Sequence, residues 1–298
     1  MIRRSTLLKG TIAFAAVTAM ASAHADLLDD IKAAKKIRIA IDLGTPPYGM
    51  TDGQMNPTGS DVETARLLAK DLGVALEIVQ TTGANRIPFL QADKADIVVS
   101  SLSVTPDREK VIDFSVPYAQ ILSVVVGPKT AAIKSFDDLA GKRVGTTRGT
   151  TNDRLATESA KGAQIVRFDD DATLLTAVST GQVEIAATAP SLVKVIRDNA
   201  PQRDIEVKFV MKAFPLGIGM RKGEAKLQKW INDWIQANTT NGQLTAIQKK
   251  YHGGLGPAPC SPSSAKRSAE DPNERHAQHP PAAAEPGNPP RRARLRQQ

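Results

Sequence analysis

The chain has 298 residues, of which 41% are apolar, 23% charged and 4% aromatic, and its formal net charge is +8. This length and apolar fraction predict one large or two medium folded domains and exclude a wholly disordered chain. The single cysteine, Cys260, excludes an internal disulfide framework and a thiolate metal cluster, and the four histidines lie too close to the chain ends for a histidine-centred triad within the body.

Most of the positive charge lies outside the body of the chain. Residues 1–25 and 255–298 each carry a net charge of +3, whereas residues 26–254 carry only +2. A nucleic-acid-binding domain needs a basic face on its folded part, so we expect no nucleic acid as partner.

The first 25 residues are typical of an export signal. Three basic residues precede an uncharged apolar run over 11–21, and Ala23, His24 and Ala25 then give the small-x-small pattern of a cleavage site. The apolar run is shorter than the ~20 residues that a membrane span needs. We therefore expect a soluble mature protein that begins near Asp26 and lies outside the cytoplasm; a buried N-terminal helix is the alternative, and the general and twin-arginine export routes both stay open.

The body then alternates strands and helices. An apolar strand over 37–41 precedes a helix for which Ser60 and Glu63 form a predicted capping box, and Gly73 ends that helix. The rest of this first unit is a strand over 75–79, a short helix over 87–92 and a buried strand over 97–100. This order predicts a mainly parallel sheet with right-handed crossovers.

The same alternation repeats further along the chain. Strands are predicted over 143–146, 165–168, 183–187 and 205–210, and helices over 152–160, 172–180 and 190–199. Two more helices follow, the first anchored in the core by Trp230 and Trp234.

Two such units predict two α/β lobes, one made of residues 26–124 and 217–254 and the other of residues 125–216. Extended runs over 122–127 and 216–220 predict the two hinge strands, with a ligand in the cleft. Residues 255–298 contain nine prolines and no helical or strand period, so we expect a disordered tail, with adhesion to an anionic surface as the alternative.

Ligands of open α/β sheets bind at the carboxyl ends of the strands, which points to the loops after residues 41, 99, 146 and 187. After the first strand, Asp42 and Tyr48 can face a cleft, although Tyr48 can equally pack within its own lobe.

After the third strand come Ser100, Ser101 and Ser103, and then Arg108 in a short helix capped by Thr105. Serine hydroxyls, free amides and a guanidinium together suit a carboxylate. The alternative is that Arg108 pairs with Asp107 or Asp113 on the surface.

In the second half, Gly149, Thr150 and Thr151 precede the helix that begins at residue 152. Their amides and hydroxyls are suited to an anion at the helix N-terminus. The loop lacks the lysine of a nucleotide-binding P-loop. Thr151 can also be read as a helix cap only.

Over residues ~37–253 the chain resembles the family 3 solute-binding proteins, the periplasmic amino-acid receptors of ABC importers. The resemblance rests on residues 59–69, 100–118 (SSLSVTPDREKVIDFSVPY), 141–151 (GKRVGTTRGTT) and 241–253. It implies a two-lobed type II flytrap that is not an enzyme and that uses no cofactor and no metal. It also implies an amino acid or related carboxylate as ligand, an inner-membrane ABC permease as partner, and a monomer in the periplasm. Because no cysteine directly follows the export signal, we expect no lipid anchor.

The resemblance also implies roles for single residues. Arg108 is similar to the arginine that grips the ligand α-carboxylate, and Ser101 and Ser103 match residues that bond the ammonium and carboxylate groups. Thr151 matches the residue that closes on the carboxylate from the second lobe, and Asp42 a position that often contacts the ligand side chain. The remaining expected pocket positions are Thr45, Tyr48, Ser100 and Thr150.

Ala189 departs from the family pattern, because the resemblance implies an aspartate there to hold the α-ammonium. Either Asp42 or another acid replaces it, or the ligand lacks an α-ammonium. The alternative function is a periplasmic cyclohexadienyl (prephenate or arogenate) dehydratase-like enzyme on the same scaffold, with Glu184 or Asp42 as general acid.

Overall fold

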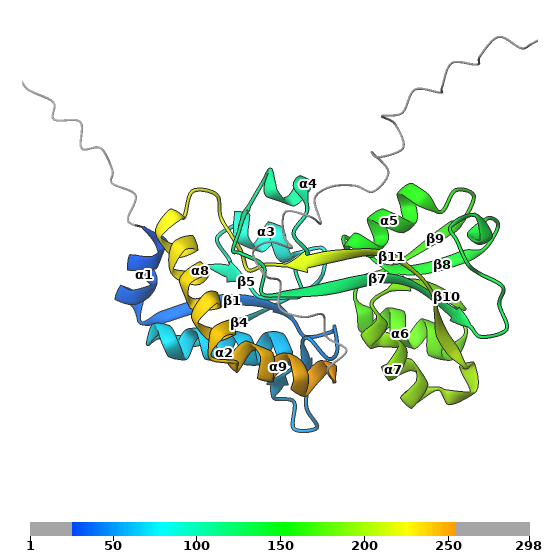
Figure 1. The fold of residues 1–298 in the computed structure, drawn as a ribbon, viewed down its shortest axis with the longest axis horizontal. Helices are drawn as coiled ribbons and strands as arrows, with labels where there is room; N and C mark the ends of the chain where they lie inside the picture. The colour runs from blue at the N-terminus through cyan, green and yellow to red at the C-terminus, as the bar shows by residue number, and fades with distance from the viewer. Residues whose placement is uncertain (1–25, 254–298) are drawn as a thin grey trace, which may run out of the picture.

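A computed structural model describes residues 26–253, so the predicted export signal and the predicted tail lie outside the described residues. The described chain forms two lobes, each built on a five-stranded sheet with helices against it, and two long strands run between the lobes (Figure 1). The predicted two-lobed α/β fold is therefore confirmed.

The first lobe is built on a sheet with the strand order β4-β1-β5-β12-β6. Its strands are β1 (Lys36–Asp42), β4 (Ala75–Thr81), β5 (Ile97–Val98), β6 (Asp113–Phe114) and β12 (Gly219–Met220), and β2 (Met50–Thr51) pairs with β3 (Pro57–Thr58) beside it. Its helices are α1 (Leu27–Ala34), α2 (Ser60–Leu72), α3 (Arg86–Gln91), α4 (Pro106–Glu109), α8 (Ala225–Thr240) and α9 (Gln243–His252).

The second lobe is built on a sheet with the order β11-β7-β10-β8-β9. Its strands are β7 (Ala119–Pro128), β8 (Arg143–Thr147), β9 (Gln164–Phe168), β10 (Ile185–Thr188) and β11 (Ile205–Leu216). Its helices are α5 (Thr151–Ser159), α6 (Asp171–Thr180) and α7 (Pro190–Asn199), with short 3-10 turns η1 (Asp137–Leu139) and η2 (Pro201–Arg203).

Both sheets are mixed rather than mainly parallel. In the first lobe, β1 pairs in parallel with β4 and β5, but β12 is antiparallel to β5 and β6. In the second lobe, β8 pairs in parallel with β9 and β10, but β7 is antiparallel to β10 and β11. The βαβ alternation accounts for the parallel strands, because each is reached through a helical crossover. The antiparallel strands belong to the segments that enter and leave the second lobe.

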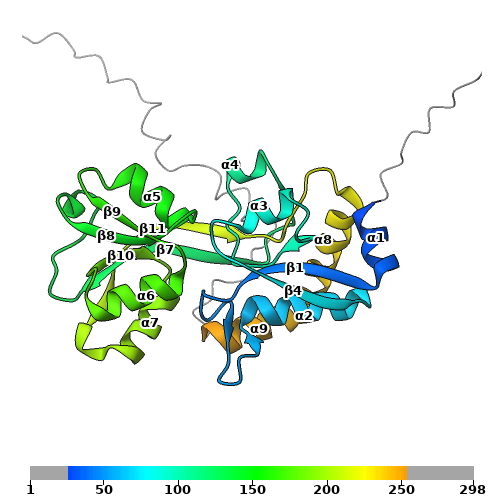
Figure 2. The same cartoon turned by 180° about the vertical axis from the view of Figure 1, so that it is seen from behind.

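The connection between the lobes is a long antiparallel pair of β7 and β11, whose register runs from Ala119 opposite Leu216 to Pro128 opposite Ile205. Both views show this pair crossing the gap between the lobes (Figures 1 and 2). The second hinge strand lies earlier in the sequence than predicted, because Gly219 and Met220 already pair with β5 and β6 in the first lobe. Pro215 obscures the end of β11 in the sequence, and it is tolerated there because β11 lies at the edge of its sheet.

The capping box predicted at Ser60 and Glu63 is wrong. Gly59 occupies the N-cap position of α2, and Ser60 is the first helical residue. The Ser60 hydroxyl lies 3.0 Å from Nε2 of His252, and Glu63 accepts a 2.7 Å hydrogen bond from the hydroxyl of Tyr251. Both side chains therefore fasten α9 onto the first lobe instead of capping their own helix.

Helix α8 is anchored in the core of the first lobe, as predicted for its two tryptophans. Trp234 is buried, and its indole nitrogen donates a 2.8 Å hydrogen bond to the Asp71 carboxylate, which satisfies the buried N–H group. Trp230 packs against the same apolar cluster from a partly buried position.

Within residues 26–253, no helix combines the length and the apolar character needed to cross a membrane.

Candidate functional site: a polar pocket between the lobes

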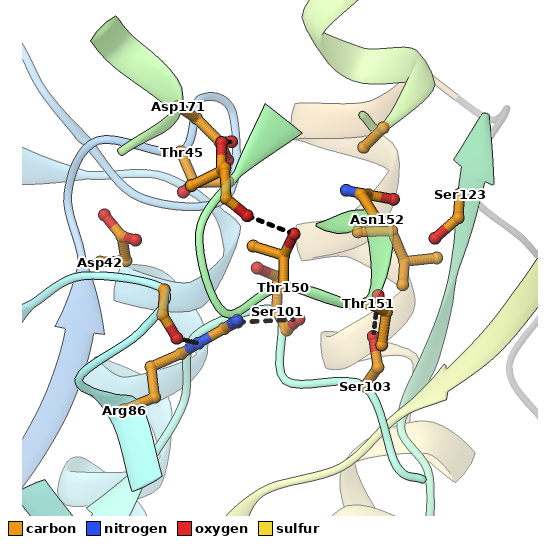
Figure 3. A pocket seen from close by; sticks show the side chains of 14 residues that line it. Asp42, Thr45, Arg86, Ser101, Ser103, Ser123, Thr150, Thr151, Asn152 and Asp171 are labelled. Carbon is orange, nitrogen blue, oxygen red and sulfur yellow. Dashed lines mark hydrogen bonds between the residues drawn. The ribbon is translucent and has the colours of Figure 1, made fainter. Parts of the chain in front are cut away.

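A polar pocket lies where the ends of the two sheets face each other (Figure 3). The first lobe contributes residues that follow β1, β4 and β5, the second contributes residues that follow β8, β9 and β10, and β7 contributes two more. The loops predicted after residues 41, 99, 146 and 187 are all among them, whereas the loops after β4 and β9 were not predicted. Its lining residues are Asp42, Thr45, Gly83, Arg86, Ser101, Ser103, Ile121, Ser123, Thr147, Thr150, Thr151, Asn152, Asp171 and Ala189.

Seven of the ten predicted site residues line this pocket, namely Asp42, Thr45, Ser101, Ser103, Thr150, Thr151 and Ala189. Ser100 lies directly behind the lining, where its hydroxyl accepts a 2.9 Å hydrogen bond from the amide of Asp42. Tyr48 does not line the pocket: its side chain is buried in the core of the first lobe, and its ring centroid is 4.5 Å from that of His252. Of the two interpretations of Tyr48, the structure favours packing within its own lobe.

Arg108 lies in a groove that adjoins the pocket and shares Thr150 and Thr151 with it. Its Nη1 donates a 2.9 Å hydrogen bond to the carbonyl of Ser103, and its Nη2 donates a 3.3 Å bond to the carbonyl of Gly149 in the opposite lobe. The alternative pairing with Asp107 or Asp113 is wrong, because these carboxylates bind lysines.

Within residues 26–253, no carboxylate forms an ion pair with Arg108. Loss of solvent, together with repulsion from Arg86 and Arg154, lowers the pKa of Arg108 to about 9. The two carbonyl oxygens accept hydrogen bonds from two of its N–H groups but do not neutralise the guanidinium. A carboxylate entering from the pocket would supply the missing charge and accept two parallel hydrogen bonds.

Several contacts join the lobes around the pocket. Thr150 is the N-cap of α5, since its hydroxyl accepts a 3.2 Å hydrogen bond from the amide of Asp153. This leaves the hydroxyl of Thr151 to face Ser103 across the cleft at 3.4 Å. The helix-cap interpretation therefore applies to Thr150, and Thr151 belongs to the contact between the lobes.

Arg86 is a pocket residue that the sequence patterns did not indicate. It is only 5% exposed, and it donates hydrogen bonds to the carbonyls of Gly83 (3.1 Å) and Ser100 (2.8 Å). These bonds hold the loop after β5, in which Ser101 adopts a left-handed φ of 41° that a residue with a side chain rarely takes. Arginine is seldom fully buried, so nothing in the local pattern distinguished Arg86 from a surface residue.

Asp171 is the second residue that was missed. It begins α6, and its carboxylate accepts a hydrogen bond from the hydroxyl of Thr147. It faces Asp42, whose Oδ1 accepts a 2.9 Å hydrogen bond from the amide of Gly44. Burial is the main cause that raises the pKa of both carboxyl groups, and repulsion adds to it, from Asp170 at Asp42 and from Asp42 at Asp171. An aspartate at the start of a helix is usually explained by the helix dipole, so no local pattern assigned Asp171 to a site.

A third carboxylate lies beneath the same loop. Asp61 is 1% exposed, and the amide of Ser101 and the hydroxyl of Tyr118 both donate to it. Burial nevertheless raises its pKa to about 7.

Within residues 26–253, no three side chains of the usual ligating types are placed to hold a metal ion.

The model of one protein family, the bacterial extracellular solute-binding proteins, family 3, matches residues 37–254. This chain is a family 3 solute-binding protein. The match covers both lobes and the pocket between them, so the resemblance inferred from the sequence motifs is confirmed.

This family 3 protein is also similar to individual curated proteins and solved structures. It is 29% identical to the L-cystine-binding protein TcyJ of Escherichia coli over 83% of this chain and 94% of the relative, and 28% identical to the glutamine-binding protein GlnH of Bacillus subtilis over 76% and 84%. A mutant of ArgBP from T. maritima superposes with a TM-score of 0.71 at 28% identity, covering 76% of this chain and 99% of that one. The ancestral amino acid-binding protein AncCDT-1, a precursor of cyclohexadienyl dehydratase, gives a TM-score of 0.68 at 32% identity, with 75% and 98% covered.

Proposed function

We propose that the protein is the extracytoplasmic substrate-binding component of an ABC importer, and that it captures a small carboxylate-bearing solute, a polar amino acid or a close analogue. The observation that carries this proposal is the polar pocket whose walls come from both lobes, with Arg108 beside it as a cation that no carboxylate of the described residues pairs with. The similar proteins support the ligand class, since their names include binding proteins for L-cystine, glutamine and arginine.

Capture works through closure of the lobes. In the open form, Arg108 and the Ser101 loop hold the carboxylate on the first lobe. Closing adds the hydroxyl and amide of Thr151 from the second lobe. Because only the closed form makes both sets of contacts, the ligand shifts the population towards it. The closed form then docks on an inner-membrane permease and delivers the solute.

The place of action follows from the first 25 residues. Their export-signal pattern supports cleavage near Asp26 and release of the protein into the periplasm. N-terminal sequencing of the protein recovered from the periplasmic fraction tests this; an intact N-terminus on membrane-bound protein would refute it.

A thermal-shift screen of the chain starting at Asp26 tests the binding function. The compounds are the twenty amino acids, L-cystine, opines and small organic acids. A true ligand stabilises the folded state by about 2.7 kcal/mol at a concentration a hundred times its Kd, which is a readily measured rise in melting temperature. If no carboxylate-bearing compound raises the melting temperature, the proposed function is wrong.

The enzymatic alternative has a direct test of its own. AncCDT-1 is itself an amino acid-binding protein that preceded cyclohexadienyl dehydratase, so similarity to it does not favour catalysis here. We expect neither prephenate nor arogenate to be consumed by the purified protein. Appearance of an aromatic product at a rate that follows protein concentration would support the enzyme instead.

A further inference from the structure

The two ends of the pocket differ in charge. Figure 3 shows Asp42 and Asp171 at one end with Thr45 near them, whereas Ser123 and Asn152 lie at the other end. Asp42 comes from the end of β1 in the first lobe, and Asp171 comes from the start of α6 in the second. The carboxylates thus approach one region from opposite sides of the cleft.

Strand order places Ala189 at the neutral end. Ala189 directly follows β10, and Thr188 pairs with Val124 on β7, so Ala189 falls beside Ser123. Asp171 follows β9, which is two strands away from β10 in the sheet. Two strand spacings amount to ~10 Å. A group held by Asp171 therefore lies well away from one held beside Ala189.

The acidic end carries more negative charge than the described protein neutralises. Arg86 is the arginine that faces both carboxylates, but its Nε and Nη1 already donate to backbone carbonyls. The hydroxyl of Thr45 is also a hydrogen-bond donor to both carboxylates, but it has a single proton to donate. Burying a charge costs free energy unless the charge is paired, so a cation with several N–H donors would suit this end of the pocket.

We propose that Asp42 and Asp171 together hold a cationic group of the ligand, at the end of the pocket remote from Ala189. The ligand class is a carboxylate with a distant ammonium or guanidinium, such as an ω-amino or ω-guanidino acid. An α-ammonium contributes little to affinity, because Ala189, Ser123 and Asn152 offer it only neutral groups. The proposal rests on the proposed function for the carboxylate end, where Arg108 and Thr151 act.

The same arrangement couples the cation to closure. Without a cation, closing brings two carboxylates from opposite lobes towards each other, and like charges at short range repel. A cation between them turns this repulsion into two attractions that exist only in the closed form. The ligand's charge therefore contributes to the closed population as well as to affinity.

The test is isothermal titration calorimetry at neutral pH with four probes: L-arginine, 4-guanidinobutyrate, L-glutamine and butyrate. L-Arginine and 4-guanidinobutyrate should bind with similar affinity, and L-glutamine and butyrate about tenfold more weakly or worse. Asp171→Asn should weaken both guanidinium probes about tenfold or more, since hydrogen bonds to charged groups are the strong ones. Asp169→Asn is the matched control, because Asp169 is 85% exposed two residues away and lies outside the pocket lining. It should change affinity by less than about twofold.

A second variant guards against misfolding of the first. Asp42→Asn removes the charge from the opposite lobe and keeps an oxygen for the amide of Gly44, so it should weaken the guanidinium probes to a similar extent. The proposal is overturned if L-glutamine binds as tightly as L-arginine, or if both folded asparagine variants keep wild-type affinity for 4-guanidinobutyrate. In either case, the proposed function still holds if a carboxylate-bearing compound raises the melting temperature in the thermal-shift screen. If no such compound does so, the proposed function itself is wrong.

Discussion

Replacement of Arg108 by alanine should nearly abolish binding of the carboxylate ligand while the fold persists. Arg108 lies in the short helix α4, which contributes no residue to either apolar core cluster of the first lobe. In the structure its side chain donates two hydrogen bonds to carbonyls, of which only the one to Ser103 lies within its own lobe. The stability of the lobes therefore depends little on this side chain, whereas binding depends on it strongly.

The size of the loss follows from the bound carboxylate, which Arg108→Ala leaves without its charged partner. Removing one partner of a desolvated, hydrogen-bonded charge pair costs about 2–5 kcal/mol. At about 1.4 kcal/mol for each tenfold change, this corresponds to a loss of roughly thirtyfold to a few thousandfold in Kd. Arg108→Lys should fall between wild type and Arg108→Ala, because lysine keeps the charge but cannot make two parallel hydrogen bonds.

The assay is calorimetric titration of the tightest amino-acid ligand from the thermal-shift screen, with a melting curve of each variant. Arg66→Ala is a suitable control, because the Arg66 guanidinium also donates to a backbone carbonyl, that of Pro57 at 2.9 Å, but on the exposed surface of α2. It should bind like wild type. If Arg108→Ala kept its affinity to within about threefold, the cation beside the pocket would not be the carboxylate partner, and the orientation proposed for the ligand would be wrong.

Three further predictions concern closure, pH and the departure at residue 189. A Cβ on Gly149 would lie 2.8 Å from the Cα of Ala84 in the opposite lobe, so Gly149→Ala should hold the lobes apart and weaken binding about tenfold or more in calorimetry. Gly162→Ala is the control, because Gly162 has a similar left-handed φ (77° against 72° for Gly149) but no such contact with the other lobe. This control variant should bind normally. Burial raises the pKa of Asp61 from 3.8 to about 7. The protonated carboxyl therefore contributes its full stabilisation below about pH 4, and this contribution is lost as the pH rises through about 7. The free energy of unfolding should fall by at most about 4 kcal/mol over this range. Urea unfolding should show this fall with pH for the wild type and less of it for Asp61→Asn, and parallel curves for the two proteins would contradict it. Ala189→Asp should improve L-glutamine binding about tenfold and leave 4-guanidinobutyrate nearly unchanged in the same titrations; no gain would mean that residue 189 does not face an α-ammonium.

The loops of the site could be located from the sequence, because strand ends and helix caps are local patterns. Thr105 caps α4 by accepting a hydrogen bond from the amide of Arg108, with Pro106 in the first helical position, as its sequence context predicts. Helix α7 runs over Pro190–Asn199, as predicted from its start at a proline. Even Ala189, a residue without chemistry of its own, was placed among the pocket residues by the resemblance to the family pattern.

The errors have a common physical origin. Ser60 and Glu63 have the spacing of a capping box, but α9 returns from the far end of the chain and binds both side chains. Tyr48 belongs to a pocket loop, but the ring of His252 packs against it and holds it in the core. In each case a partner about 200 residues away in sequence competes with the local pattern and wins.

The sequence by itself determined the alternation of strands and helices, the strand ends that carry polar loops, and the presence of Arg108 beside a helix start. These depend on residues within a few positions of one another, so a linear pattern contains them. Only the tertiary structure decided that Arg86 is buried beneath the Ser101 loop and that Asp171 faces Asp42. Burial and charge pairing depend on which segments meet in space, and Asp42 and Asp171 meet only because β7 and β11 hold the two lobes face to face.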